Sequence, residues 1–146
     1  MIKALFFDID GTLVSFMTHR IPESAITALE AAKRHGAGVY ISTGRPKAII
    51  NNLGDIAHLI DGYITTNGAY CFCGSEDVRC NPIPTADVDR CVSFCDARGY
   101  AAMVVGKSGF SVINENEEFI RIFRDMLNVR NIDEAVPLED IKAGPV

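Results

Sequence analysis

The chain has 146 residues, of which 48% are hydrophobic and 23% are charged. This composition is typical of a globular protein with one domain, or one domain and part of another, and excludes a disordered chain. Nineteen acidic and fourteen basic residues give a net charge of -5, which argues against a nucleic-acid partner. No apolar stretch approaches the roughly 20 residues of a membrane-spanning helix, and the N-terminus does not resemble a signal peptide. We therefore expect a cytoplasmic protein with no membrane partner.

The first half of the sequence alternates between short apolar strands and helices. The expected elements are, in chain order, a strand over 3–7, a helix over 21–36, a strand over 37–43, a helix over 46–56 that Pro46 opens, and a strand within 61–70. Each connection between strands is long enough for a parallel crossover. The alternation predicts an α/β fold with a doubly wound, Rossmann-like parallel sheet.

The pattern changes from about residue 69. The expected elements are a hairpin over 69–80 turning at Gly74 and Ser75, a helix over 85–98, strands over 100–106 and 109–114 joined at Lys107 and Ser108, and a helix over 114–127 that Asn114 and Glu117 cap. The prolines of 81–85 mark a boundary, so we expect one module over 1–81 and an α+β module over 82–146. The closing residues, 138–146, predict neither a strand nor a helix, so the second module is expected to be incomplete.

Five cysteines are present, and their number and spacing favour neither disulfides nor a metal site: Cys71, Cys73, Cys80, Cys91 and Cys95. Cys91 and Cys95 share a helical stripe with Val88 and Val92. This stripe predicts buried thiols that pack as small hydrophobic groups.

Polar side chains follow three predicted strands at their carboxyl ends. Asp8, Thr43 and Asn67 each lie just past such an end. In a doubly wound sheet, ligands collect at this edge. The strand order therefore predicts that these three side chains converge on one crevice.

Asp8 and Asp10 stand one residue apart in the string "FFDIDGTL". One carboxylate can act as a nucleophile, the second can serve as acid and base, and a pair of acids attracts Mg²⁺. Gly11 would let backbone N–H groups approach a bound phosphate, and the Thr12 hydroxyl could orient Asp10. This chemistry fits phosphoryl transfer. In the alternative interpretation, the two acids only cap a turn.

The strings "FFDIDGTL", "VYISTGRP" and "TNGA" together resemble motifs of the haloacid dehalogenase (HAD) superfamily. More narrowly, they resemble its Cof-type sugar-phosphate phosphatases, which carry a class IIB α/β cap after the third core strand. The resemblance implies that 1–81 is the N-terminal part of the core and 82–146 is the front part of the cap. It implies an Mg²⁺-dependent phosphohydrolase that acts on small phosphorylated metabolites through an aspartyl-phosphate.

The resemblance also implies residue roles. Asp8 would be the nucleophile, Asp10 the general acid and base, and Thr43 a hydrogen-bond donor to the transferring phosphoryl group. The Asp8 carboxylate and the Asp10 carbonyl would bind Mg²⁺. Thr43 could instead be only a cap at the end of its strand.

Three further residues would bind substrate. Gly44 and Arg45 would shape the entrance for phosphate and substrate, and Asn67 would lie near the substrate. Arg45 could instead form a surface ion pair, and Asn67 could be only a turn residue.

The resemblance also implies a lysine well after the cap and a Gly-Asp-x-x-Asn-Asp motif, and neither occurs in these 146 residues. Gly54-Asp55 precedes the expected cap and does not match that motif. Two interpretations stay open: the N-terminal part of a phosphatase, or a non-catalytic metal- and phosphate-binding protein that another chain completes. A phosphomutase of the same fold is a third. An exposed sheet edge would favour an oligomer.

Overall fold

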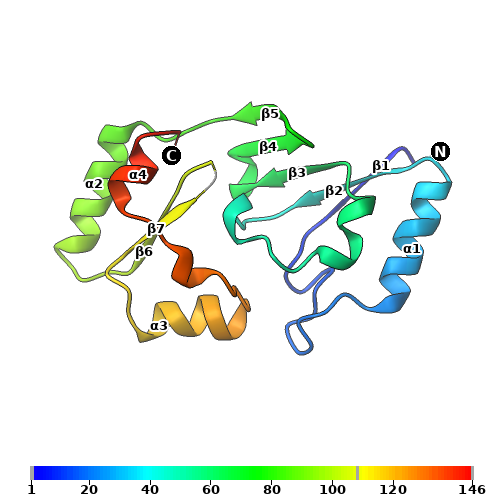
Figure 1. The fold of residues 1–146 in the computed structure, drawn as a ribbon, viewed down its shortest axis with the longest axis horizontal. Helices are drawn as coiled ribbons and strands as arrows, with labels where there is room; N and C mark the ends of the chain where they lie inside the picture. Colours follow the sequence, from blue (N-terminus) through cyan, green and yellow to red (C-terminus); the bar gives the residue numbers. More distant parts are fainter. Residues whose placement is uncertain (1, 108, 146) are drawn as a thin grey trace. The chain divides into compact units, whose positions relative to one another are not determined.

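The computed structural model describes residues 2–107 and 109–145, and the chain forms two compact units. The first contains Met1–Arg45 and Ile50–Cys80, and the second contains Pro46–Ile49 and Asn81–Val146. Figure 1 shows the course of the chain through both. The assignment of these units to a core and a cap stays a prediction.

The first unit is built on a five-stranded sheet with the order β1-β2-β3-β4-β5. The strands are β1 (Ala4–Phe7), β2 (Gly38–Ser42), β3 (Gly62–Thr65), β4 (Tyr70–Cys73) and β5 (Glu76–Cys80). The pairs β1–β2 and β2–β3 are parallel, and the hairpin of β3, β4 and β5 is antiparallel. The predicted α/β class with a Rossmann-like sheet is therefore confirmed, with two antiparallel strands added to the parallel ones.

Helix α1 (Glu23–Arg34) connects β1 to β2. Glu23 in its first turn and Lys33 and Arg34 in its last turn complement the helix dipole. Its Leu29 side chain is 3% exposed and packs in the same apolar cluster as Val39 of β2. The helix thus covers one face of the parallel strands and positions the loop that precedes it.

The prediction of an α-helix over 46–56 is wrong. The structure has a 3₁₀ turn η1 (Lys47–Ile49) in the second unit and a 3₁₀ helix η2 (Gly54–Leu59) in the first. Asparagine and glycine are poor helix formers, and both occur between these turns and at the start of η2. Ile56 of η2 is nevertheless fully buried in the core of the first unit, so the apolar positions are used without an α-helix.

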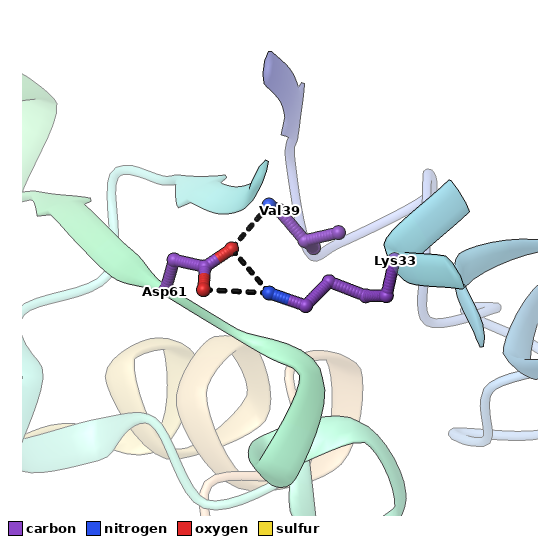
Figure 2. A network of polar contacts seen from close by, with 3 residues as sticks. All are labelled: Lys33, Val39 and Asp61. Carbon is purple, nitrogen blue, oxygen red and sulfur yellow. Dashed lines mark hydrogen bonds and ion pairs between the residues drawn. The ribbon is translucent and has the colours of Figure 1, made fainter. Parts of the chain in front are cut away.

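An ion pair joins α1 to the start of β3 (Figure 2). The Lys33 ammonium lies 2.6 Å and 2.7 Å from the two carboxylate oxygens of Asp61, and the Val39 N–H donates to Asp61 Oδ2 at 2.7 Å. The Asp61 N–H in turn donates to the Val39 carbonyl at 2.8 Å. The hydrogen bond from Lys33, followed by that from Val39, lowers the pKa of Asp61 below its ordinary value.

The second unit contains a two-stranded sheet and short helices. Its elements are α2 (Thr85–Asp96), β6 (Ala102–Val105), β7 (Phe110–Ile113), α3 (Glu117–Ile120), the π-helical turn η4 (Arg121–Met126), η5 (Ile132–Glu134) and α4 (Leu138–Lys142). Strands β6 and β7 pair in antiparallel fashion, as expected. Of the two residues expected to join them, Ser108 lies outside the described residues. Phe110 and Phe119 are buried in the apolar cluster of this unit.

Three details of the second unit correct the sequence analysis. Asn116, and not Asn114, caps α3: its Oδ1 accepts a hydrogen bond from the Phe119 N–H at 2.9 Å. Cys91 is exposed and Cys95 is half-buried, so the stripe on α2 is only partly covered. The polar C-terminal stretch forms the short helix α4, which buries Ile141.

Neither unit, over the residues described, has a helix long and apolar enough to cross a membrane.

Candidate active site

Asp8 directly follows β1 and is exposed, whereas the next residue, Ile9, is fully buried. The chain then turns tightly, because the Val14 N–H donates to the Ile9 carbonyl at 2.8 Å and the Gly11 N–H donates to the Val14 carbonyl at 2.9 Å. Gly11 has φ +78°, and a Cβ atom there would lie 2.7 Å from the Phe16 ring. This turn needs glycine, and it brings Asp10 back beside the strand end.

The loop after β2 is tied to the loop after β3. The Thr43 N–H donates to the Ile64 carbonyl at 2.9 Å, and the Asn67 N–H donates to the Thr43 carbonyl at 3.3 Å. The Arg45 carbonyl accepts from the Thr66 N–H at 3.2 Å. These bonds extend the parallel pairing past the strand ends, so residues 43–45 are held by backbone contacts and the site residues among them are preorganised.

Three consecutive residues after β3 have left-handed backbone conformations. Their φ angles are +51° at Thr66, +52° at Asn67 and +91° at Gly68. The left-handed region is costly for a β-branched residue such as threonine, and strain of this kind concentrates at functional sites. The fully buried Thr65 side chain supports the turn, because its hydroxyl donates to the Tyr70 carbonyl at 2.9 Å.

A pocket of about 350 Å³ lies at these strand ends in the first unit. Its lining residues come from all three parallel strands or the loops after them: Asp8, Ser42, Thr43, Gly44, Ile64, Asn67 and Gly68. The convergence predicted from strand order is therefore observed, and Gly44 joins it. Sequence reasoning missed Ser42, Ile64 and Gly68, although the position of Ser42 beside Thr43 at a strand end was a usable indication.

The other predicted site residues lie outside that lining set, among the residues described. Gly11 and Thr12 use their N–H groups inside the turn, with the Thr12 N–H donating to the Ile9 carbonyl at 3.3 Å. Arg45 and Asp10 instead contact each other. The predicted roles of these residues in substrate binding and catalysis stay predictions.

Arg45 and Asp10 form a bidentate ion pair. The Arg45 Nε lies 2.7 Å from Asp10 Oδ2, and a terminal nitrogen of its guanidinium lies 2.8 Å from Asp10 Oδ1. The Arg45 side chain is only 4% exposed and that of Asp10 is 19% exposed. The Arg45 N–H donates to the Thr43 hydroxyl at 3.1 Å, which leaves the hydroxyl proton of Thr43 able to donate to a ligand.

Two oxygen donors of the site suit Mg²⁺. This ion is commonly held by one or two carboxylates together with substrate phosphate and water. The exposed Asp8 carboxylate and the Asp10 backbone carbonyl fit that pattern. In the part of the chain that the structure describes, no cluster of three or more His, Cys, Asp or Glu side chains could hold a metal.

The fold and site define an α/β protein with an exposed aspartate and a buried threonine hydroxyl at the carboxyl ends of parallel strands. The family model of haloacid dehalogenase-like hydrolases matches residues 5–144. The chain belongs to this family.

Known proteins support this membership. The HAD subclass IIB sugar phosphatase BT4131 is 51% identical, with a TM-score of 0.87 over 99% of this chain and 56% of that one. A structure from work on a trigonal-bipyramidal intermediate in a phosphoryl-transfer superfamily is 50% identical, with a TM-score of 0.90 over 100% of this chain and 56% of that one. The phosphoglycolate phosphatase of Metallosphaera sedula is 33% identical over 86 residues, which are 58% of this chain and 39% of that protein. The chain thus spans about half the length of these relatives.

Proposed function

We propose that the protein is an Mg²⁺-dependent phosphohydrolase that acts on small phosphorylated metabolites. The observation that carries this proposal is the exposed Asp8 carboxylate in a pocket with the 5%-exposed Thr43, while Asp10 is held as an ion pair beside it. Two carboxylates in such different surroundings suit two different roles. The family membership supports the same chemistry.

In the proposed reaction, an Asp8 carboxylate oxygen attacks phosphorus and the bond from phosphorus to the ester oxygen breaks. The Thr43 hydroxyl donates a hydrogen bond to the phosphoryl oxygens, and Asp10 in its protonated form gives its proton to the departing alkoxide. Asp10, now a carboxylate, takes a proton from the water that attacks the aspartyl-phosphate, which releases phosphate and restores Asp8. Bound Mg²⁺ would supply positive charge next to the phosphoryl group.

We propose sugar phosphates as the substrate class, because the relative named a sugar phosphatase is 51% identical over nearly the whole chain. Phosphoglycolate is the alternative substrate to compare in the assay, because a second relative is named phosphoglycolate phosphatase. A mutase would return an isomer of the sugar phosphate and no free phosphate, so product analysis separates the two reactions.

The test measures Mg²⁺-dependent phosphate release from p-nitrophenyl phosphate and from a panel of sugar phosphates, with Asp8→Asn as the key variant. We expect the variant to lose at least about 10³-fold in kcat, because a catalytic nucleophile has no substitute. Hydroxylamine trapping should label Asp8 and no other aspartate. Phosphate release that survives Asp8→Asn would overturn the assignment.

A second candidate is metal and phosphate binding without turnover, in which the pocket lined by Asp8 and Thr43 holds phosphate but no phosphoryl group is transferred. It predicts that the chain releases no phosphate but binds inorganic phosphate in the presence of Mg²⁺. Calorimetry of phosphate binding to the same chain distinguishes this function from hydrolysis. Asp8→Asn would then change the affinity for phosphate, whereas the chain would have no measurable turnover with or without the substitution.

A further inference from the structure

We infer that Arg45 is a positioning residue that acts on the reaction through Asp10, and not a substrate-binding residue. This inference rests on the proposed function for its catalytic readout. It begins from the two hydrogen bonds, 2.7 Å and 2.8 Å long, by which the Arg45 guanidinium holds both oxygens of Asp10. Paired in this way, a planar fork fixes both the position and the plane of a carboxylate.

The Arg45 side chain is buried, and its backbone is fixed. The guanidinium-bearing side chain is 4% exposed, so a substrate has little access to it. The backbone on either side is anchored, since the Arg45 N–H donates to Thr43 Oγ1 and the Arg45 carbonyl accepts from the Thr66 N–H. A side chain anchored at its base and paired at its tip has little freedom to turn toward a ligand.

The charge of Arg45 also has a consequence for the pocket. Asp8 and Asp10 are two residues apart, and two bare carboxylates would repel an incoming phosphate dianion. While Asp10 is ionised, the Arg45 guanidinium compensates its charge, which leaves Asp8 as the uncompensated carboxylate among the pocket-lining residues that the structure describes. Removing the guanidinium would return the charge of Asp10 to the site and would also release its carboxylate from a fixed orientation.

The test is a double-mutant cycle with Arg45→Met, Asp10→Asn and the double variant, measured for turnover of an alkyl phosphate. We expect Arg45→Met to lower kcat about 10²-fold, the lower end of what a displaced general acid and base costs. In the Asp10→Asn background the same change should alter kcat by less than about 2-fold, because residues that act as a unit are non-additive. Arg45→Lys should recover part of the loss, since it keeps the charge but not the fork.

The leaving group gives a second readout that a merely structural role would not move. p-Nitrophenolate departs without a proton, whereas an alkoxide needs one, so Arg45→Met should slow phosphoenzyme formation more for the alkyl phosphate. Lys33→Met is the matched control, because it removes another ion pair of the first unit that does not touch the pocket. We expect Lys33→Met to change stability and leave both rates unchanged.

Two results would overturn the inference: an equal loss from Arg45→Met in both backgrounds, or a rise in KM that persists when Asp10 is asparagine. Either would show direct contact between Arg45 and substrate.

If the chain has no turnover, the proposed function is wrong, but the inference about Arg45 can still be tested. The same double-mutant cycle is then measured by the affinity for inorganic phosphate. Arg45→Met should then weaken binding only when Asp10 is present. The double variant, which buries no unpaired charge, covers the case in which Arg45→Met does not fold.

Discussion

The ion pair of Lys33 and Asp61 gives a stability prediction whose size can be worked from the structure. The Asp61 side chain continues the pairing of β2 and β3 by one position: its backbone N–H donates to the Val39 carbonyl and its carboxylate accepts from the Val39 N–H (Figure 2). Val39 is fully buried, so its N–H would lose its partner if Asp61 were replaced by alanine. An unsatisfied buried amide costs about 1–3 kcal/mol.

The contribution of Lys33 is smaller. Its side chain is 30% exposed and that of Asp61 is 37% exposed, so water screens the pair and its contribution is about 0.5 kcal/mol. We therefore expect Asp61→Ala to lower the free energy of unfolding by about 2 kcal/mol. Asp61→Asn keeps an oxygen for the Val39 N–H and should cost only about 0.5 kcal/mol, the value of the ion pair.

Urea unfolding at a series of pH values tests this prediction. The pKa of Asp61 is lower in the folded chain than in the unfolded chain, so the stabilisation is complete above the unfolded pKa of about 4 and is lost as pH falls through the folded pKa. The advantage of the natural chain over Asp61→Asn should therefore be present at pH 6 and should disappear in strong acid. A difference that stays constant over this range would refute the electrostatic reasoning, as would an unchanged stability in Lys33→Met at pH 6.

Two further changes test packing and capping. Gly62→Ala would place a Cβ atom 2.6 Å from Cys73 Sγ and 3.1 Å from the Phe72 carbonyl oxygen. We expect it to lower the free energy of unfolding, measured in urea, by about 1–3 kcal/mol. Adding Cys73→Ala should recover part of this loss, and additive losses from the two changes would contradict the contact. Asn116→Ala removes the cap of α3 and should cost about 1 kcal/mol. The same change at Asn114, which the sequence favoured as the cap, should leave the N–H of Phe119 satisfied, and its hydrogen exchange should be unchanged.

The strand order of the first unit and the convergence of its strand ends were predictable from local pattern. Short apolar runs after turn residues indicate buried strands, and parallel strands place Asp8, Thr43 and Asn67 at one edge. The second helix was not predictable in the same way. Ile49 and Ile50 have helical spacing to Leu53, but Asn51, Asn52 and Gly54 favour turns, and tertiary packing resolved the conflict with two 3₁₀ segments.

The prediction that the cysteines of the α2 stripe are buried was wrong for a related reason. Periodicity shows which residues share a helix face but not how far that face is covered, and only Val88 of α2 is fully enclosed. The predicted cap of α3 lies two residues before the observed one. Asn114 and Asn116 both precede the helix, and from the sequence either could accept a hydrogen bond from its first turn. Asn114 instead has φ +49° and donates to Asp96 Oδ1 at 3.0 Å and to the Tyr100 carbonyl at 3.3 Å. These contacts depend on the position of the end of α2 and of the loop after it.

The different surroundings of the two acids depend on a contact that the string "FFDIDGTL" does not contain. Asp8 and Asp10 are equivalent in that string, and the sequence assigns them different roles only through resemblance. In the folded chain, Asp8 is exposed at the pocket, while Asp10 is bound by a guanidinium 35 residues later in the sequence. That contact requires β1 and β2 to be parallel neighbours, so that the loops after both strands meet at one edge. If the proposed roles hold, a variant that keeps both acids but loses Arg45 should therefore keep Asp8 as the nucleophile and lose the positioned acid and base, Asp10.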